Sequence, residues 1–225
     1  MLTARDGSGT EAHQALESLC RTYWQPLYAY IRHQGSDPDE SADLTQAFFA
    51  KLLEEDFLDG VNPEKGRFRS FLLAALRHFL SHERDRDRAL KRGGGSQTLS
   101  IDVESGESGY ALRPSKDMSP ADVFERRWAI TVLDRALARL RLEAKESGDE
   151  TQVEELKQYL TSAEPQAPYR EAAAALGISE GAVATAVYRL RQQYGQRLRA
   201  EIAELVLDPA DIDDELRHML AVVRP

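Results

Sequence analysis

The stretch from Tyr169 to Arg191 constrains the fold most, because it combines two short helical segments with a tight turn between them. The first, alanine-rich segment ends at Gly177, whose freedom to adopt a positive φ angle suits the end of a helix. The second begins at Ser179, whose hydroxyl can cap the free amides of a new helix. The apolar residues that would bury one shared face are Ala173, Leu176, Ile178, Val183, Val187 and Leu190. This pattern predicts a helix-turn-helix.

A helix-turn-helix reads DNA when its second helix presents polar side chains to a major groove. The side chains that the predicted second helix projects outward are Glu180, Thr185, Tyr188, Arg189 and Arg191. The alternative is an ordinary helical hairpin within an all-α core, since helix pairs of this form also occur without DNA. The segment favours DNA reading and leaves the hairpin open.

Length and composition favour a cytoplasmic protein. The chain has 225 residues, which is long enough for two small domains. Its apolar runs stay well short of the roughly 20 residues that span a membrane, and its first residues lack the apolar core of a signal peptide. Cys20 is the single cysteine, which rules out an internal disulfide and fits a reducing compartment. We therefore expect a cytoplasmic protein without membrane insertion.

The net charge of −9 conceals a segregation of acidic and basic segments. Acidic residues gather in 37–59 and 201–215, whereas lysine and arginine gather in 65–92 and 189–199. Local basic patches, rather than the total charge, bind phosphates. The two basic segments therefore predict two nucleic-acid contacts, and the acidic segments predict at least one protein contact. Taken singly, each run also fits a solvated helix face.

Apolar spacing predicts helices along nearly the whole chain, and no strand run is long enough to build a sheet. The expected helices cover about 11–33, 38–59, 66–92, 150–161 and 209–223, with another from Pro120 past Leu140 and the pair within 169–191. Pro26 should kink or split the first of these. The apolar face of the last helix is expected to pack on the second domain, with a built-in regulator of a basic surface as the alternative.

These elements predict an all-α protein of two small helical domains joined by a flexible linker, the second domain containing the helix-turn-helix. The glycine- and serine-rich segment 93–120 is the linker. The predicted first domain covers residues 1–92 and the second covers 121–204. Residues 205–225 form an acidic amphipathic tail.

Two further motifs, ADLTQAFFAKLL and KGRFRSFLLAALRHFL, precede the helix-turn-helix. The order of these three motifs resembles that of the extracytoplasmic-function group of bacterial RNA polymerase sigma factors. The resemblance extends from about Tyr23 to Arg199. The resemblance implies a non-enzymatic protein that binds core RNA polymerase and promoter DNA and directs transcription initiation. Its first domain would grip the polymerase and melt the minus-ten element, and its second would bind the minus-thirty-five element. It implies no cofactor, and an anti-sigma factor or a regulatory kinase as further partners.

The resemblance also assigns site residues. The polymerase-binding set is Asp43, Leu44, Gln46, Ala47 and Ala50. The minus-ten set supplies the cations that an unpaired strand requires and consists of Arg77, His78, Ser81, Arg84, Arg88, Lys91 and Arg92. The minus-thirty-five set is Tyr169, Arg170, Ser179, Glu180, Gly181, Ala182, Thr185, Arg189 and Arg191.

Two other functions remain open from the sequence. A stand-alone helix-turn-helix regulator would form a dimer on palindromic sites. A sigma-like protein-interaction module without promoter activity would fit Ala182 and Ala184, which stand where many of the sigma factors carry threonine and a basic residue. A carboxylate metal site at Asp39 and Asp43 would need a Glu-x-x-His arrangement on other helices. The chain does not carry the pair of such motifs that a four-helix metal site uses, so no metal is expected.

Overall fold

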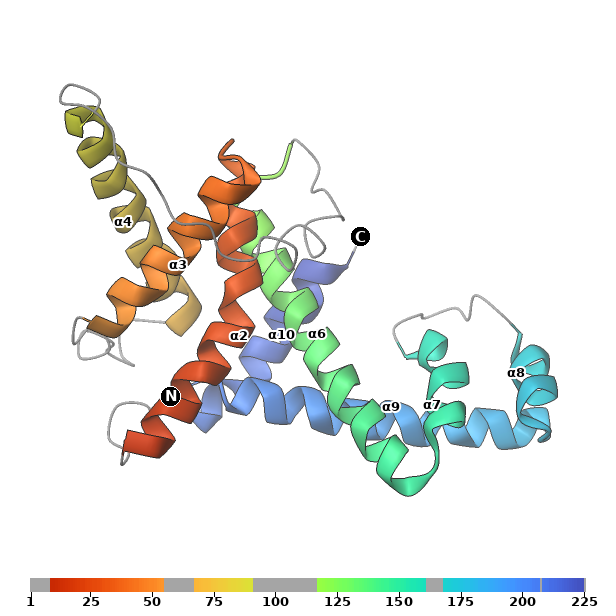
Figure 1. Cartoon of the computed structure of the whole chain (residues 1–225). Coiled ribbons are helices and arrows are strands. Elements are labelled where there is room, and N and C mark those ends of the chain that lie inside the picture. The colour runs from red at the N-terminus through yellow and green to blue at the C-terminus, as the bar shows by residue number, and fades with distance from the viewer. Residues whose placement is uncertain (1–8, 55–66, 91–116, 161–167, 207, 225) are drawn as a thin grey trace. The chain divides into compact units, whose positions relative to one another are not determined.

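The computed structural model describes residues 9–54, 67–90, 117–160, 168–206 and 208–224 (Figure 1). Every regular element in these ranges is a helix, which confirms the all-α class for the described part of the chain. By compactness the chain divides into one unit of Met1–Thr131 with Leu205–Pro225 and another of Val132–Glu204. Most of the predicted linker lies outside the described residues. The predicted domain boundaries therefore stay a prediction.

The first unit contains three helices from the N-terminal part of the chain: α2 (Gly9–His33), α3 (Pro38–Glu54) and α4 (Phe68–Leu90). Helix α2 runs as one helix through Pro26, so of the two predicted effects, a kink or a split, the split does not occur. Helix α3 begins at Pro38, as predicted, because a proline at the first helical position costs no backbone hydrogen bond. The Asp37 carboxylate accepts a hydrogen bond from the Glu40 amide at 2.8 Å and caps this helix.

Aromatic side chains connect the helices of the first unit. The Tyr23 ring stacks on Phe124 at 6.4 Å and meets the edge of Phe68 at 5.6 Å, so α2 packs against both α4 and the first part of α6 (Pro120–Ser147). The Phe48 and Phe79 rings, 5.6 Å apart, join α3 to α4. These buried contacts hold in place the outer faces of α3 and α4, which carry the predicted polymerase and minus-ten residues.

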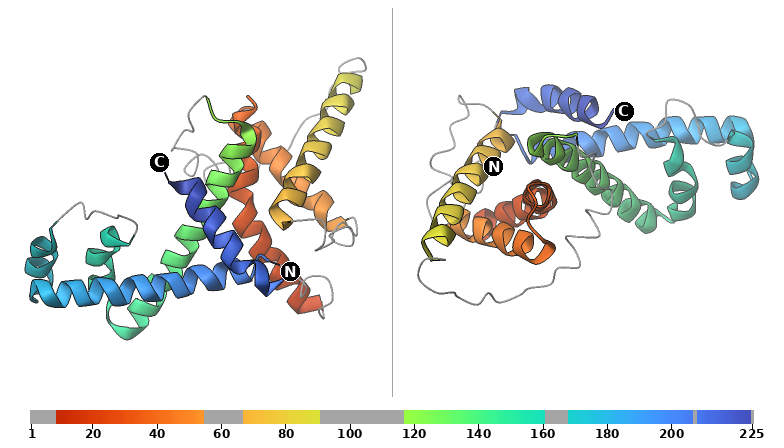
Figure 2. Two further views of the ribbon diagram at one scale, coloured as in Figure 1. Left: turned by 180° about the vertical axis from the view of Figure 1, so that it is seen from behind. Right: turned by 90° about the horizontal axis from the view of Figure 1, so that it is seen from above.

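The C-terminal helix α10 (Ile212–Val223) belongs to the first unit. It follows a short 3-10 turn, η4 (Pro209–Asp211), and lies alongside the first part of α6 (Figure 2). Met219 is fully buried there, and the His218 imidazole contacts both Glu125 and the Trp128 ring. Glu125 and Trp128 fall within the predicted second domain of 121–204, so the tail packs there as expected. It also contacts the predicted first domain, because Glu215 pairs with Arg67 and Arg69, and that contact was not expected.

The second unit contains the rest of α6, then α7 (Glu150–Leu156), the 3-10 turn η3 (Lys157–Tyr159), α8 (Tyr169–Leu176) and α9 (Glu180–Ala203). Polar contacts bind the C-terminal half of α9 to α6. The Tyr194 hydroxyl donates to the Leu133 carbonyl at 3.1 Å, and the buried Glu201 pairs with Arg135 at 2.7 Å and Arg139 at 2.5 Å. These contacts hold the C-terminal half of α9 against α6. The N-terminal half of α9 carries the candidate site.

No helix in the described ranges combines the length and the apolarity that crossing a membrane requires.

Candidate nucleic-acid interface

The connection between α8 and α9 has the geometry that the sequence predicts. Gly177 ends α8 with a φ angle of +66°, and the Ile178 amide donates back to the Ala173 carbonyl at 3.1 Å. The Ser179 hydroxyl then accepts a hydrogen bond from the Ala182 amide at 3.2 Å. Residues 177–179 thus provide hydrogen bonds for backbone groups at both the end of α8 and the start of α9. We call these two helices and their turn the α8–α9 unit.

Helix α9 has one buried face and a wide exposed one. Val183, Val187 and Leu190 are buried, as their spacing predicts, whereas Ile178, which was expected on the same face, is 37% exposed. The predicted minus-thirty-five residues that are exposed in the α8–α9 unit are Arg170, Ser179, Glu180, Gly181, Ala182, Thr185, Arg189 and Arg191. Tyr188 is 65% exposed on the same helix, although the resemblance did not include it in the site. The N-terminal half of α9 therefore offers a solvent-facing surface with one large aromatic ring and few bulky side chains.

Two predicted site residues have partners within the second unit. The Arg191 guanidinium donates two hydrogen bonds to the Tyr159 carbonyl, from Nε at 2.9 Å and from Nη2 at 2.7 Å. Tyr169 is half-buried and lies edge-on against the Tyr159 ring, with centroids 5.2 Å apart. Both side chains thus anchor the end of η3 to the α8–α9 unit. The sequence carries no local signal for either contact, because Arg191 and Tyr159 are 32 residues apart.

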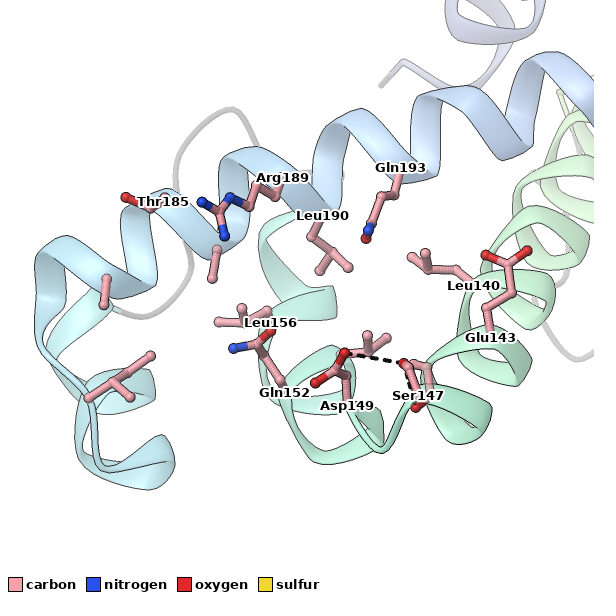
Figure 3. A pocket seen from close by; sticks show the side chains of 15 residues that line it. Leu140, Glu143, Ser147, Asp149, Gln152, Leu156, Thr185, Arg189, Leu190 and Gln193 are labelled. Carbon is pink, nitrogen blue, oxygen red and sulfur yellow. Dashed lines mark hydrogen bonds between the residues drawn. The ribbon is translucent and has the colours of Figure 1, made fainter.

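A hollow of about 780 Å³ lies between one side of α9 and the elbow of α6 and α7 (Figure 3). Thr185, Arg189 and Gln193 border it from α9, whereas Glu143 and Asp149 border it from the elbow. The Thr185 hydroxyl donates to the Gly181 carbonyl at 3.0 Å, which leaves its oxygen able to accept a further hydrogen bond. One wall is thus cationic and the opposite wall is acidic.

Helix α4 presents four of the predicted minus-ten residues on its solvent side. Arg77, His78, Ser81 and Arg84 are exposed. The Arg77 Nε atom donates to the Tyr30 hydroxyl at 3.3 Å, and the Arg84 guanidinium donates to the Gln34 side-chain carbonyl. The remaining members of the set lie outside the part of the chain whose side chains are described, namely Arg88, Lys91 and Arg92.

The partners of these arginines determine whether the positive charge of each guanidinium is neutralised. Tyr30 and Gln34 are neutral, so they orient the guanidinium groups of Arg77 and Arg84 without cancelling their charge. The arginines of α6 instead face carboxylates, as in the pairs of Arg135 and Arg139 with Glu201. Arginine also presents several N–H donors, so one neutral contact leaves others for a phosphate. Arg77 and Arg84 therefore keep their positive charge on the α4 surface, although the total charge of the chain is negative.

Helix α3 presents the predicted polymerase-binding residues together. Gln46, Ala47 and Ala50 are exposed, and Asp43 and Leu44 are half-buried beside them. On the opposite side, Phe48 and Leu52 are buried in the first unit. Helix α3 thus has a solvent-facing strip of small and polar residues with a carboxylate at its side, which can receive another helix closely.

One charged cluster was missed in the sequence. Arg69, within the GRFRSFL motif, is only 3% exposed and lies 4.5 Å above the Trp128 ring. Its guanidinium pairs with Glu125 at 2.8 Å and also with Glu215 of α10, which is 4% exposed. Burial lowers the pKa of Arg69, and the adjacent Glu125 opposes that shift. The cluster joins α4, α6 and α10 and is inaccessible to DNA, so Arg69 serves the fold.

Comparisons with known proteins returned nothing: no family model, no curated protein and no solved structure matches this chain.

Proposed function

We propose that this chain is a sigma factor of the extracytoplasmic-function type, which binds core RNA polymerase and directs it to promoters. The observation that carries the proposal is the α8–α9 unit, whose second helix buries one face and leaves Thr185 and Arg189 in solvent. A helix that enters a major groove needs such an exposed face near its N-terminal end. We therefore take the α8–α9 unit to be a helix-turn-helix that reads the minus-thirty-five element.

The α4 surface supports a second contact, with the unpaired strand of the minus-ten element. Opening a promoter costs stacking energy of about 1.4 kcal/mol per base step, so the melting domain must bind the separated strand well. Arg77 and Arg84 supply cations held by neutral acceptors, and Ser81 lies exposed between them in the sequence. Such cations follow a phosphate backbone irrespective of its sequence.

The strip on α3 supports the third contact, with the polymerase itself. Ala47 and Ala50 are exposed and small, so the backbone of a partner helix can approach them closely. Asp43 beside them offers a carboxylate to a basic partner. In this proposal the first unit carries both the polymerase contact and the minus-ten contact.

The proposal is tested by transcription in vitro from a genomic fragment library, with bacterial core polymerase and with or without this protein. We expect new start sites that require the protein and disappear with Asp43→Arg. Arg189→Ala should weaken the same promoters, whereas Arg217→Ala, an exposed arginine on α10, should leave them unchanged. If the folded protein produces no new start site, the sigma-factor proposal fails.

A charge-specific variant tests the α4 contact separately. Gln34→Glu places a carboxylate beside the Arg84 guanidinium, which now donates to the neutral Gln34 amide. A surface ion pair changes stability by only about 0–1 kcal/mol. We therefore expect an intact fold, weaker binding to single-stranded promoter DNA and a shallower dependence of that binding on salt. Unchanged DNA binding would remove Arg84 from the contact.

A second candidate is a sigma-like module that binds another protein without using promoters. The contact of Arg191 with the Tyr159 carbonyl favours it, since this arginine is already engaged. Ala182 and Ala184 also leave much of the α9 surface without side chains that read bases. The two candidates differ in the transcription experiment, because a module that does not use promoters would produce no new start site, with or without Arg189→Ala.

A further inference from the structure

Two histidines lie side by side on the exposed face of α4. His78 and His82 are four residues apart, which places both side chains on one face of a helix. Their Nε2 atoms are 3.2 Å apart and their ring centroids are 4.4 Å apart. Both residues are exposed. The resemblance assigned His78 to DNA and gave His82 no role.

The separation of the two nitrogens fits a single metal ion. A zinc–imidazole bond is about 2.0–2.1 Å long. Two such bonds at a tetrahedral angle hold their nitrogens about 3.3 Å apart, and at a right angle about 2.9 Å apart, by the same bond length. The observed 3.2 Å lies between these values. We propose that His78 and His82 together bind one divalent transition-metal ion of the zinc, copper or nickel kind, for which imidazole is a suited ligand.

The two imidazoles fill only part of the coordination shell. No group of three or more histidine, cysteine or acidic side chains in the described ranges is arranged to hold a metal. Water or a ligand from outside the chain must therefore occupy the other positions. Arg77 and Arg84 flank the pair in the sequence and disfavour a further cation, whereas an oxygen of a DNA phosphate would offset both charges. The ion and a DNA strand should therefore strengthen each other's binding.

The ion site stands on the histidine geometry alone, and the coupling to DNA rests on the proposed function of α4. The first experiment uses calorimetric titration of the chelator-treated full chain with Zn²⁺, Cu²⁺ and Ni²⁺ in turn. We expect one ion per chain for at least one metal, with affinity at least tenfold lower in both His78→Gln and His82→Gln. His13→Gln on α2 is the matched control and should keep the affinity of the unchanged chain.

Circular dichroism of each variant confirms its fold, and both replaced side chains are exposed. Equal affinity in the unchanged chain and in both α4 variants, for all three metals, would overturn the site. The second experiment measures binding of a labelled single-stranded oligonucleotide with and without the bound metal. We expect at least threefold tighter binding with the metal, lost in His82→Gln. Unaltered DNA affinity would overturn the coupling alone, and absence of DNA binding would instead count against the proposed function.

Discussion

Removing the carboxylate of Glu215 should destabilise the first unit more than any exposed charge change on α10. This carboxylate is 4% exposed and pairs with Arg69, itself 3% exposed, and with Arg67 at 2.9 Å. Glu215→Gln keeps the volume of the side chain and removes its charge. Arg69 would then be left in an apolar setting with one carboxylate, Glu125, in place of two.

The expected size follows from the burial of both partners. Breaking a buried ion pair by removing one member costs about 3–5 kcal/mol, because the other charge is left uncompensated. Since Glu125 still compensates Arg69, we expect the lower end of this range, about 3 kcal/mol. The matched control is Asp214→Asn, which removes an exposed pair with Arg217 on the same helix. Exposed pairs contribute about 0–1 kcal/mol.

The assay is urea unfolding followed by tryptophan fluorescence. The chain has two tryptophans, Trp24 and Trp128, and both belong to the first unit. Their emission therefore reports that unit specifically, and Trp128 lies beneath the Arg69 guanidinium. A loss of about 3 kcal/mol lowers the urea midpoint by about 1–3 M, because the free energy of unfolding falls by about 1–3 kcal/mol per molar urea.

Equal unfolding midpoints for Glu215→Gln and Asp214→Asn would refute this reasoning. Such a result would mean that the cluster contributes no more than an exposed pair, and that the apolar contacts of α10, centred on Met219, hold the helix by themselves. A double-mutant cycle with Arg69→Gln isolates the pairwise energy, and a coupling near zero would support the same refutation.

Three further predictions concern other parts of the fold. Gly177→Ala should destabilise the second unit by about 1–2 kcal/mol, because the φ angle of Gly177 is +66°. Gly181→Ala, inside α9, should instead stabilise the unit by up to about 1 kcal/mol. Urea unfolding followed by circular dichroism distinguishes the two effects. Burial raises the pKa of Tyr23, so stability should fall as pH rises above the usual tyrosine pKa, and Tyr23→Phe should remove part of that loss in alkaline unfolding curves. Arg191→Ala removes both hydrogen bonds to the Tyr159 carbonyl and should cost about 1–3 kcal/mol, whereas an unchanged unfolding midpoint would return Arg191 to the DNA-facing set.

The sequence predicts those parts of the fold that depend on local chemistry. Pro38 begins α3, Gly177 ends α8 and Ser179 caps α9, because each residue acts on the backbone within a few positions of itself. The exposed and buried faces of α9 are predictable for the same reason, since helical spacing alone determines which side chains share a face. The helical spacing therefore predicted the exposed residues of the candidate site, including Tyr188, which the resemblance alone did not assign.

The remaining contacts depend on residues that are distant in the sequence. Arg69 stands in a basic run and resembles a DNA-binding cation, yet its partners Glu125 and Glu215 lie on α6 and α10. Arg191 likewise resembles a contact on the reading helix until the Tyr159 carbonyl is placed beside it. A guanidinium has the same sequence signature whether it binds a phosphate, a carboxylate or a carbonyl. Only the tertiary structure distinguishes these three roles.

The same distinction resolves the apparent conflict between a net charge of −9 and a function on DNA. Many carboxylates of the described helices are used inside the units, as Glu201 is by Arg135 and Arg139, and such pairs contribute little field at a distance. Arg84 on α4 is oriented by a neutral amide and keeps its charge. Since phosphate binding depends on the local field within about one Debye length, roughly 8–10 Å in physiological salt, the chain can be acidic as a whole and still attract DNA at α4.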